Sequence, residues 1–327
     1  MEAAAASLRE RQPVGDDEAQ PVVISVIIAS YNAREVLADC LDSIYRNPPS
    51  EPYEILVVDD ASSDGSSEMI QSRFPDVRLR RNEVNRHYTF SNNRALDEAR
   101  GQYICLLNND TVVLPEAFDR MLAFLRQHPD AGAVGSKLLN EDGTTQWSIK
   151  PLPDLGAALF GGRSILYRLF PNNPASKKRI LHLDREMTEP FTVGYISGAA
   201  KLMPRQVVDR VGPLDPRMFY HVDADYCKRI ADAGYKCYYL PTASVIHLNH
   251  KGGTTSSLRQ RFRSLLSFHV DCYVYYCKHM QRYAWSPLRI VVLFGLACQF
   301  LVMSTVQLGS ELVSLTGSRR QPKAPAH

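Results

Sequence analysis

The sequence has little of what marks several common protein classes. Its 327 residues carry a formal net charge of only +3 and no long basic run, so nothing in it predicts a nucleic-acid partner. Its seven cysteines are odd in number and include no C-x-x-C pair, which argues against a disulfide framework or a zinc knuckle. We expect reduced, mostly buried thiols in a cytosolic protein.

Two other features are absent near the amino end. The first apolar run is followed by ASYNA, without the G-x-G-x-x-G pattern of a dinucleotide-binding turn. Residues 1–20 contain no positively charged segment followed by an apolar core, so they do not resemble a secretory signal. We expect residues 1–20 to form a disordered tail.

The stretch 290–308 near the carboxyl end has no charged residue. Its 19 residues, at about 1.5 Å per helical residue, roughly match a hydrocarbon core of about 30 Å. Gln299 and Gln307 make it less apolar than a typical span. The sequence is compatible with a single membrane span, a helix lying in the membrane plane, or a helix buried against the preceding domain or a homodimer partner.

The first two thirds of the chain alternate strand-like and helix-like segments. Val22 to Ala29 is a continuous apolar run typical of a buried parallel strand, and Arg34 to Tyr45 repeats its apolar residues at helical spacing. Similar pairs follow along the chain. This alternation predicts an α/β fold, with a mostly parallel central sheet and helices on both faces. We expect one domain over 21–257, a helical region over 258–315 and a basic disordered tail over 316–327.

Polar side chains follow three of the predicted strands. They are Ser30 to Asn32 after the first strand, Asp59 and Asp60 after the second, and Asn108 to Asp110 after YICLL. Ligands of such sheets bind outside the carboxyl ends of the strands, so these residues predict one site. The alternative is that each group is only a turn, because Asn and Asp are common turn residues.

The order of six motifs resembles one known family. VVISVIIASYN, EILVVDDASSDGS, LLNNDT, SGAAKLM, FYHVDADYCKR and VIHLNHKGG are similar to motifs of family 2 inverting glycosyltransferases of the GT-A fold, in particular the bacterial branch that builds surface polysaccharides and includes rhamnosyltransferase-like enzymes. The resemblance covers about Val22 to Ser257. It implies transfer of a sugar from a dTDP-, UDP- or GDP-linked donor to a glycan or lipid-linked acceptor, in the cytoplasm at the inner face of the plasma membrane, with membrane association.

The resemblance also implies which residues contact the nucleotide. Asp60 matches the carboxylate that hydrogen-bonds the nucleobase, while Asp59 either fixes the turn or contacts the ribose. The other matched nucleotide-binding positions are Ala29, Tyr31, Asn85, Asn93 and Asn109. The sequence departs from the family pattern at His87, which stands where the family has a glycine.

A divalent metal, Mn²⁺ or Mg²⁺, is the implied cofactor. Asp110 matches the last acid of the family's D-x-D motif, and His247 matches a second metal-contacting position. Hard cations prefer oxygen ligands and leave part of their coordination sphere to the donor phosphates. The motif here reads N-N-D, so Asn108 is a neutral amide where the family has a carboxylate, which lowers the ligand charge.

Asp223 is the implied catalytic base. An inverting transfer needs one carboxylate within hydrogen-bond reach of the acceptor hydroxyl. The family has Glu-Asp-x-Asp here, and this sequence keeps Asp223 while Val222 replaces the Glu. Gly198 and Asp225 match acceptor-side positions, with Asp225 also suited to orient the helix. The alternative for Asp223 is a helix N-cap only.

Two other functions compete with this interpretation. The substitutions at Asn108 and Val222 would suit a non-catalytic nucleotide-sugar-binding or scaffold relative. A processive synthase would carry Q-x-x-R-W, but the stretch Gln281 to Trp285 has Ala284 where the arginine is needed. We therefore expect a non-processive transferase.

Overall fold

The computed structural model describes residues 21–146, 148–154, 188–248, 258–281 and 283–317. The predicted tail over 1–20, residues 318–327 of the predicted basic tail, and residues 155–187 and 249–257 of the predicted domain lie outside the described residues. The chain divides into two compact units, and each is described by itself. The core unit comprises Met1–Pro216 and Val222–Thr254, and the C-terminal unit comprises Arg217–His221 and Thr255–His327.

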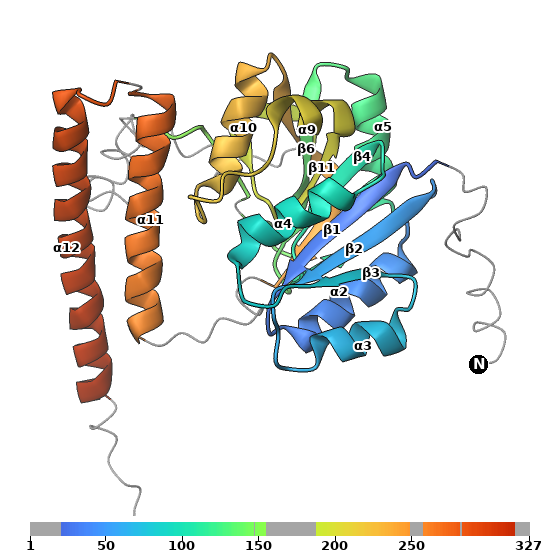
Figure 1. Cartoon of the computed structure of the whole chain (residues 1–327), viewed down its shortest axis with the longest axis horizontal. Coiled ribbons are helices and arrows are strands. Elements are labelled where there is room, and N and C mark those ends of the chain that lie inside the picture. Colours follow the sequence, from blue (N-terminus) through green and yellow to red (C-terminus); the bar gives the residue numbers. More distant parts are fainter. Residues whose placement is uncertain (1–20, 147, 155–187, 249–257, 282, 318–327) are drawn as a thin grey trace, which may run out of the picture. The chain divides into compact units, whose positions relative to one another are not determined.

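The core unit alternates strands and helices along its first half, as the apolar periodicity predicts (Figure 1). Its strands are β1 (Ile24–Ser30), β2 (Tyr53–Asp59), β3 (Arg78–Arg81), β4 (Tyr103–Leu107), β5 (Thr111–Val113), β6 (Ala131–Leu139), β7 (Ile149–Lys150), β8 (Phe191–Val193), β9 (Tyr195–Ile196), β10 (Ala200–Pro204) and β11 (Lys236–His247). Its helices are α2 (Arg34–Arg46), α3 (Ser66–Arg73), α4 (His87–Glu98), α5 (Ala117–Gln127), α9 (Arg205–Val211) and α10 (Val222–Asp232).

The main sheet has the order β3-β2-β1-β4-β10-β6-β11-β5, and β8 pairs with β11. Strands β3, β2, β1 and β4 are parallel, and β6 is parallel to β11. Strand β10 runs antiparallel to both β4 and β6, and β5 and β8 run antiparallel to β11. The carboxyl ends of β1, β2, β4 and β11 and the amino end of β10 therefore lie at one edge of the sheet.

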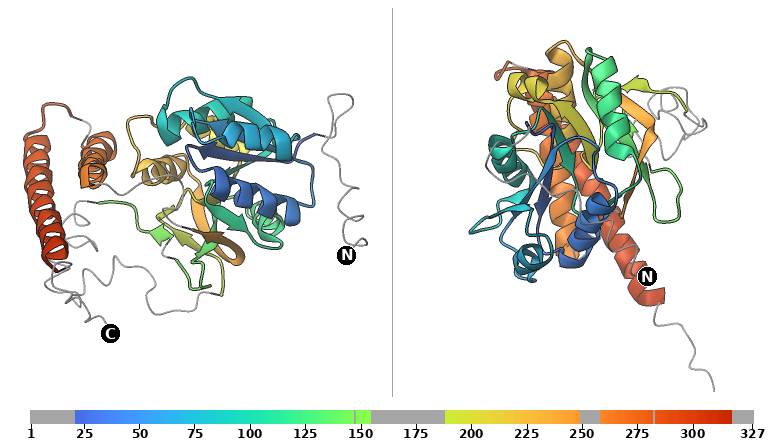
Figure 2. Two further views of the ribbon diagram at one scale, coloured as in Figure 1. Left: turned by 90° about the horizontal axis from the view of Figure 1, so that it is seen from below. Right: turned by 90° about the vertical axis from the view of Figure 1, so that its right-hand side faces the viewer.

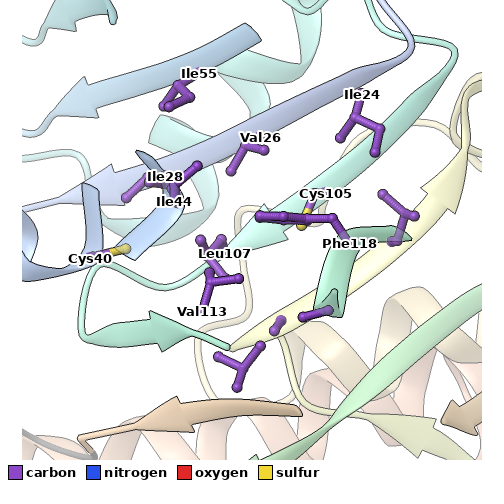
Figure 3. Close-up of a cluster of buried hydrophobic side chains, with 14 of the residues drawn as sticks. Ile24, Val26, Ile28, Cys40, Ile44, Ile55, Cys105, Leu107, Val113 and Phe118 are labelled. Atoms are coloured by element: carbon purple, nitrogen blue, oxygen red, sulfur yellow. The ribbon is translucent and has the colours of Figure 1, made fainter. Parts of the chain in front are cut away.

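One face of the sheet packs against α2, α3 and α5 in a large hydrophobic cluster. Side chains of a strand alternate between its faces, so Ile24, Val26 and Ile28 of β1 point to the same side. There they join Leu107 of β4 and Phe118 of α5, all at most 2 % exposed (Figure 3). Figure 1 shows α2 and α3 on one side of β1–β3 and α4 on the other, so helices cover both faces. This buried sheet gives the polar strand ends a rigid support.

The C-terminal unit contains α11 (Leu258–His279) and α12 (Pro287–Gly317), which lie side by side (Figure 2). Among the described residues, one helical stretch, Pro287–Gly309, is long and apolar enough to cross a membrane. Only 11 % of its most apolar 18-residue segment is buried. Ile290, Val291 and Phe294 are each more than 60 % exposed. Most of the apolar surface of α12 therefore has no cover within the described part of this chain.

Candidate active site

The polar strand ends meet at one edge of the sheet. Asn109, after β4, donates a hydrogen bond from Nδ2 to Ser30 Oγ at the end of β1 (3.0 Å). The backbone N–H of Asn108 donates to the carbonyl of Ala199, just before β10 (2.9 Å). The N–H of Leu248, just after β11, donates to the carbonyl of Asp110 (2.9 Å). Two of the three predicted groups, those after β1 and β4, thus meet here beside the start of β10 and the end of β11.

The turns after β1 and β2 are tied together beside this region. Asn32 accepts from the backbone N–H of Ser63 at Oδ1 (2.8 Å), and its own N–H donates to Ser62 Oγ (2.9 Å). Ala29 is half-buried at the end of β1, and Tyr31 is 41 % exposed directly after it. Both predicted pocket residues therefore lie beside the strand ends, and Tyr31 presents an open ring surface there.

The Asp60 side chain is almost fully buried, and its carboxylate accepts hydrogen bonds from other residues of the protein. Its carboxylate accepts from Asn82 Nδ2 (2.7 Å), from the backbone N–H of Arg86 (2.9 Å) and from that of His87 (2.7 Å). The first N–H groups of a helix have no partner inside the helix, so a carboxylate placed there stabilises the start of α4. The nucleobase contact of Asp60 stays a prediction, and a nucleobase would compete with these internal donors.

Asp59 fixes the turn after β2, one of the two roles expected for it. It is fully buried, and its carboxylate accepts from the N–H of Ser62 (2.9 Å) and from Ser67 Oγ.

His87 occupies a backbone conformation that favours glycine. Its φ of 68° lies in the left-handed region, where few non-glycine residues occur. Asn85 Oδ1 accepts from the His87 N–H (3.1 Å), so the two predicted residues lie together at the start of α4. The structure thus places an imidazole at a backbone position that favours glycine. Such strain is commonly retained at functional positions.

Two residues that were predicted to contact the substrates are hydrogen-bonded within the fold instead. The Asn93 amide exchanges two hydrogen bonds of 2.8 Å with the backbone of Leu214. Asp225 is fully buried and accepts from Arg229 Nε (2.9 Å). These contacts suit the expected helix-orienting role of Asp225, whereas its complete burial gives the acceptor-binding role no support. The nucleotide contact of Asn93 also stays a prediction.

Asp110 and His247 form a pair suited to a metal ion. Asp110 Oδ1 lies 3.3 Å from His247 Nε2, and both side chains are largely buried. Gln146 donates from Nε2 to the His247 carbonyl, which leaves its Oε1 to accept from His247 Nδ1 (3.0 Å). A ring that donates from Nδ1 presents the lone pair of Nε2, and metal-ligating histidines commonly have such a partner.

The protein supplies only part of a coordination sphere here. Among the described residues, no group of three or more His, Cys, Asp or Glu side chains could hold a metal ion. Asn108 Nδ2 lies 3.5 Å from His247 Nε2, so a neutral amide borders the pair where a second carboxylate was expected. One carboxylate and one imidazole fit a divalent cation whose other ligands come from phosphate and water.

The Asp223 carboxylate is fixed at both oxygens. Lys201 Nζ donates to Oδ1 (2.6 Å), and the backbone N–H of Gly198 donates to Oδ2 (2.8 Å). The Asp223 side chain is 23 % exposed, whereas that of Lys201 is 1 % exposed. Burial lowers the pKa of Lys201 and the charge of Asp223 raises it, and the net result lies above the ordinary value, so the ammonium stays charged. A carboxylate oriented this way keeps lone pairs for a further donor.

Gly198 is required by the close approach of this carboxylate. A Cβ at residue 198 would lie 2.6 Å from Asp223 Oδ1 and 3.0 Å from the Tyr88 hydroxyl. Gly198→Ala is expected to displace the Asp223 carboxylate and lower kcat about 10- to 100-fold, because displacements of about 1 Å have effects of this size. Steady-state kinetics check this. Gly295→Ala in α12 is the control, because its Cβ would meet nothing within 4 Å. Wild-type kcat in Gly198→Ala would show that this placement is not needed.

Three residues of the site were missed by sequence reasoning. Lys201 is a lone charge within the apolar strand SGAAKLM, and fully buried lysines are rare without a partner, so that pattern was a usable signal. Tyr88 follows His87; burial and the charge of Asp223 raise its pKa, so its hydroxyl stays protonated. No local signal marked Gln146, which precedes His247 by 101 residues.

Comparison with known proteins agrees with this geometry. The family model described as glycosyl transferase family 2 matches residues 25–212, which span β1 to the end of α9. The chain belongs to glycosyl transferase family 2. It is therefore a glycosyltransferase, and the family predicted from its motifs is confirmed. The family match ends before Asp223 and His247, so their roles are argued from geometry.

One curated relative of this family 2 enzyme is similar over most of both chains. It is the N-acetylglucosaminyl-diphospho-decaprenol L-rhamnosyltransferase of Mycobacterium tuberculosis, 28 % identical over 296 residues, which are 86 % of this chain and 92 % of the relative. This likeness agrees with the surface-polysaccharide, rhamnosyltransferase-like branch expected from the motifs.

Solved structures share the fold. The mannosyltransferase PcManGT of Pyrobaculum calidifontis, in complex with GDP-Man and Mn²⁺, has a TM-score of 0.53 and 17 % identity, covering 99 % of this chain and 82 % of its own. GalNAc-T7 with UDP, GalNAc and Mn²⁺ has a TM-score of 0.54 and 16 % identity, covering 81 % and 52 %. The predicted GT-A α/β fold is confirmed, with a central sheet that is mixed beyond β4.

Proposed function

We propose that this enzyme transfers a sugar, with L-rhamnose as the first candidate, from a nucleotide diphosphate sugar to a lipid-linked N-acetylglucosaminyl diphosphate, with inversion, in cell-surface polysaccharide synthesis. The main support is the Asp223 carboxylate, fixed by Lys201 and Gly198 beside β10 at the sheet edge that also holds Asp110 and His247. The substrate class is taken from the mycobacterial relative, whose similarity covers nearly the whole chain.

Asp223 acts as the base in this proposal. The acceptor hydroxyl donates its proton to a carboxylate oxygen as it attacks the sugar, which is the contribution of a positioned general base. Lys201 and the Gly198 N–H hold the carboxylate in one orientation, so little reorganisation is needed during the reaction. Val222 beside it is buried and shields this part of α10 from water.

Asp110 and His247 hold Mn²⁺ or Mg²⁺ in this proposal, as Mn²⁺ is present in both structural neighbours. Such an ion neutralises charge that develops on the leaving diphosphate. Gln146 orients the His247 ring, and Asn108 borders the pair as a neutral amide. Ala29, Tyr31, Asp60, Asn85, Asn93 and Asn109 remain the proposed nucleotide-side positions.

The transferase domain in this proposal is 21–257, followed by the helical region 258–315. The exposed apolar residues of α12, from Ile290 to Leu308, would bring the enzyme to the cytoplasmic face of the membrane, where a lipid-linked acceptor is available. Trp285 is 81 % exposed just before α12, and aromatic side chains of this kind favour the membrane interface. A homodimer that covers α12 is the competing arrangement.

The test uses purified full-length enzyme in lipid nanodiscs. Synthetic N-acetylglucosaminyl diphosphopolyprenol is offered with dTDP-L-rhamnose, UDP-N-acetylglucosamine or GDP-mannose, each with and without Mn²⁺ or Mg²⁺. We expect a disaccharide product from one donor only, dependent on metal. The matching nucleotide should raise the melting temperature, because a ligand of the folded state stabilises it by mass action. Stabilisation without product would favour a non-catalytic nucleotide-sugar-binding relative, and absence of both would contradict the proposal.

A further inference from the structure

A buried carboxylate in the C-terminal unit holds the chain directly before the proposed base. Asp271, in the middle of α11, is 3 % exposed. Its Oδ2 accepts from three successive backbone N–H groups, those of Phe219 (2.8 Å), Tyr220 (2.5 Å) and His221 (3.1 Å). Successive N–H groups that converge on one oxygen form an anion-binding concavity, here filled by a side chain of the same unit.

Such a carboxylate is costly to bury unless it is fully hydrogen-bonded, and bonds to a charged acceptor are stronger than neutral ones. The segment 219–221 gains further contacts from α11. The Phe268 ring lies 5.0 Å from that of His221, and Cys272 Sγ lies 3.6 Å from His221 Nε2. Phe219 and Tyr220 are 49 % and 43 % exposed, and the Tyr220 ring lies 6.3 Å from that of Phe268. Asp271 thus binds the backbone N–H groups of all three residues of the segment.

The chain passes from His221 directly into Val222, the first residue of α10, and then into Asp223. We infer that Asp271 is a positioning residue for catalysis. By fixing the N–H groups of 219–221, it restrains the three residues that lead directly into α10, and so the backbone just before the helix that carries Asp223. The helix that carries Asp271 also packs along the apolar helix α12. The inference rests on the proposed function, because it assigns Asp223 the role of base.

The test compares Asp271→Ala and Asp271→Asn with Asp119→Ala in the full-length enzyme. Asp119 is a matched control, because its carboxylate also accepts from a backbone N–H, that of Ser50 (2.9 Å), at the edge of the core unit. Hydrogen exchange of the amides of 219–221 reports the anchor. The kcat and the donor KM, measured with dTDP-L-rhamnose and N-acetylglucosaminyl diphosphopolyprenol, report the chemistry.

Asp271→Ala should accelerate amide exchange at 219–221 and lower kcat about 10- to 100-fold, with the donor KM changed less than about twofold, because only the base is displaced. Asp271→Asn keeps an acceptor oxygen of the same reach and should recover part of kcat. Asp119→Ala should leave kcat unchanged.

Unchanged exchange in Asp271→Ala would overturn the anchor itself. Faster exchange with an unchanged kcat would overturn the positioning role. A wild-type enzyme that transfers no sugar, while Asp271→Ala still accelerates exchange, would overturn the proposed function and the catalytic consequence but retain the anchor.

Discussion

Asp223→Asn is expected to lower the rate of sugar transfer by about 10²- to 10⁴-fold, the usual contribution of a positioned general base. The amide has nearly the shape of the carboxylate but cannot take up the acceptor proton. Binding of the donor nucleotide should persist, because Asp223 contacts Lys201 and Gly198 and not the polar turns after β1 and β2. Single-turnover transfer and nucleotide-induced thermal shifts measure the two effects separately.

A loss of folding stability would imitate this result, because Asp223→Asn leaves the buried Lys201 charge without its partner. Removing one member of a buried ion pair costs about 3–5 kcal/mol, and we expect the lower end because Asp223 is partly exposed. The double variant Asp223→Asn with Lys201→Met removes both charges and should recover most of the stability but none of the transfer. A single Asp223→Asn variant that keeps more than about a tenth of the rate would refute the base assignment.

Asp110→Asn is expected to abolish the metal-dependent part of nucleotide stabilisation and to slow transfer about 100-fold or more, because metal charge stabilisation contributes several kcal/mol. The motif already reads N-N-D, so this change leaves His247 as the remaining proposed ligand. Thermal shifts by dTDP, UDP and GDP, each with and without Mn²⁺, give the measurement.

Asn108→Asp is the matched opposite change. It restores the first carboxylate of the motif beside His247 Nε2 and should tighten Mn²⁺ binding in the absence of donor, since ligand charge tunes affinity for hard cations. If Asp110→Asn still shows the full metal-dependent shift, Asp110 is not a metal ligand. If Asn108→Asp leaves Mn²⁺ affinity unchanged, the metal lies elsewhere.

Much of the fold could be predicted from local pattern. The apolar run at 22–29 contains most of β1, and the segment 34–45, with apolar residues at helical spacing, forms most of α2. The stretch 290–308 lies within α12. These predictions succeeded because a buried strand and an amphipathic helix each have a periodicity visible in a short window. The sequence also predicted that the polar residues after these strands lie close together, because parallel strands end at a common edge of the sheet.

Pairings between distant segments could not be predicted in this way. Helix α4 begins at His87, where the carboxylate of Asp60, which lies in the turn after β2, accepts from its first backbone N–H group. The pairing of Lys201 with Asp223 depends on β10 running antiparallel between β4 and β6. No local rule specifies that reversal, since strand direction is set by packing across the whole sheet.

The reversed strand β10 also divides the site along the chain. The proposed nucleotide-side residues all lie before Asp110, at or just after the ends of the parallel strands β1, β2 and β4 and at or just before α4, whereas Gly198, Lys201 and Asp223 all come after it. Donor preference and acceptor preference can therefore diverge through separate stretches of sequence. An enzyme lineage with this architecture could exchange its sugar nucleotide while keeping its acceptor, or the reverse, without rebuilding the shared sheet.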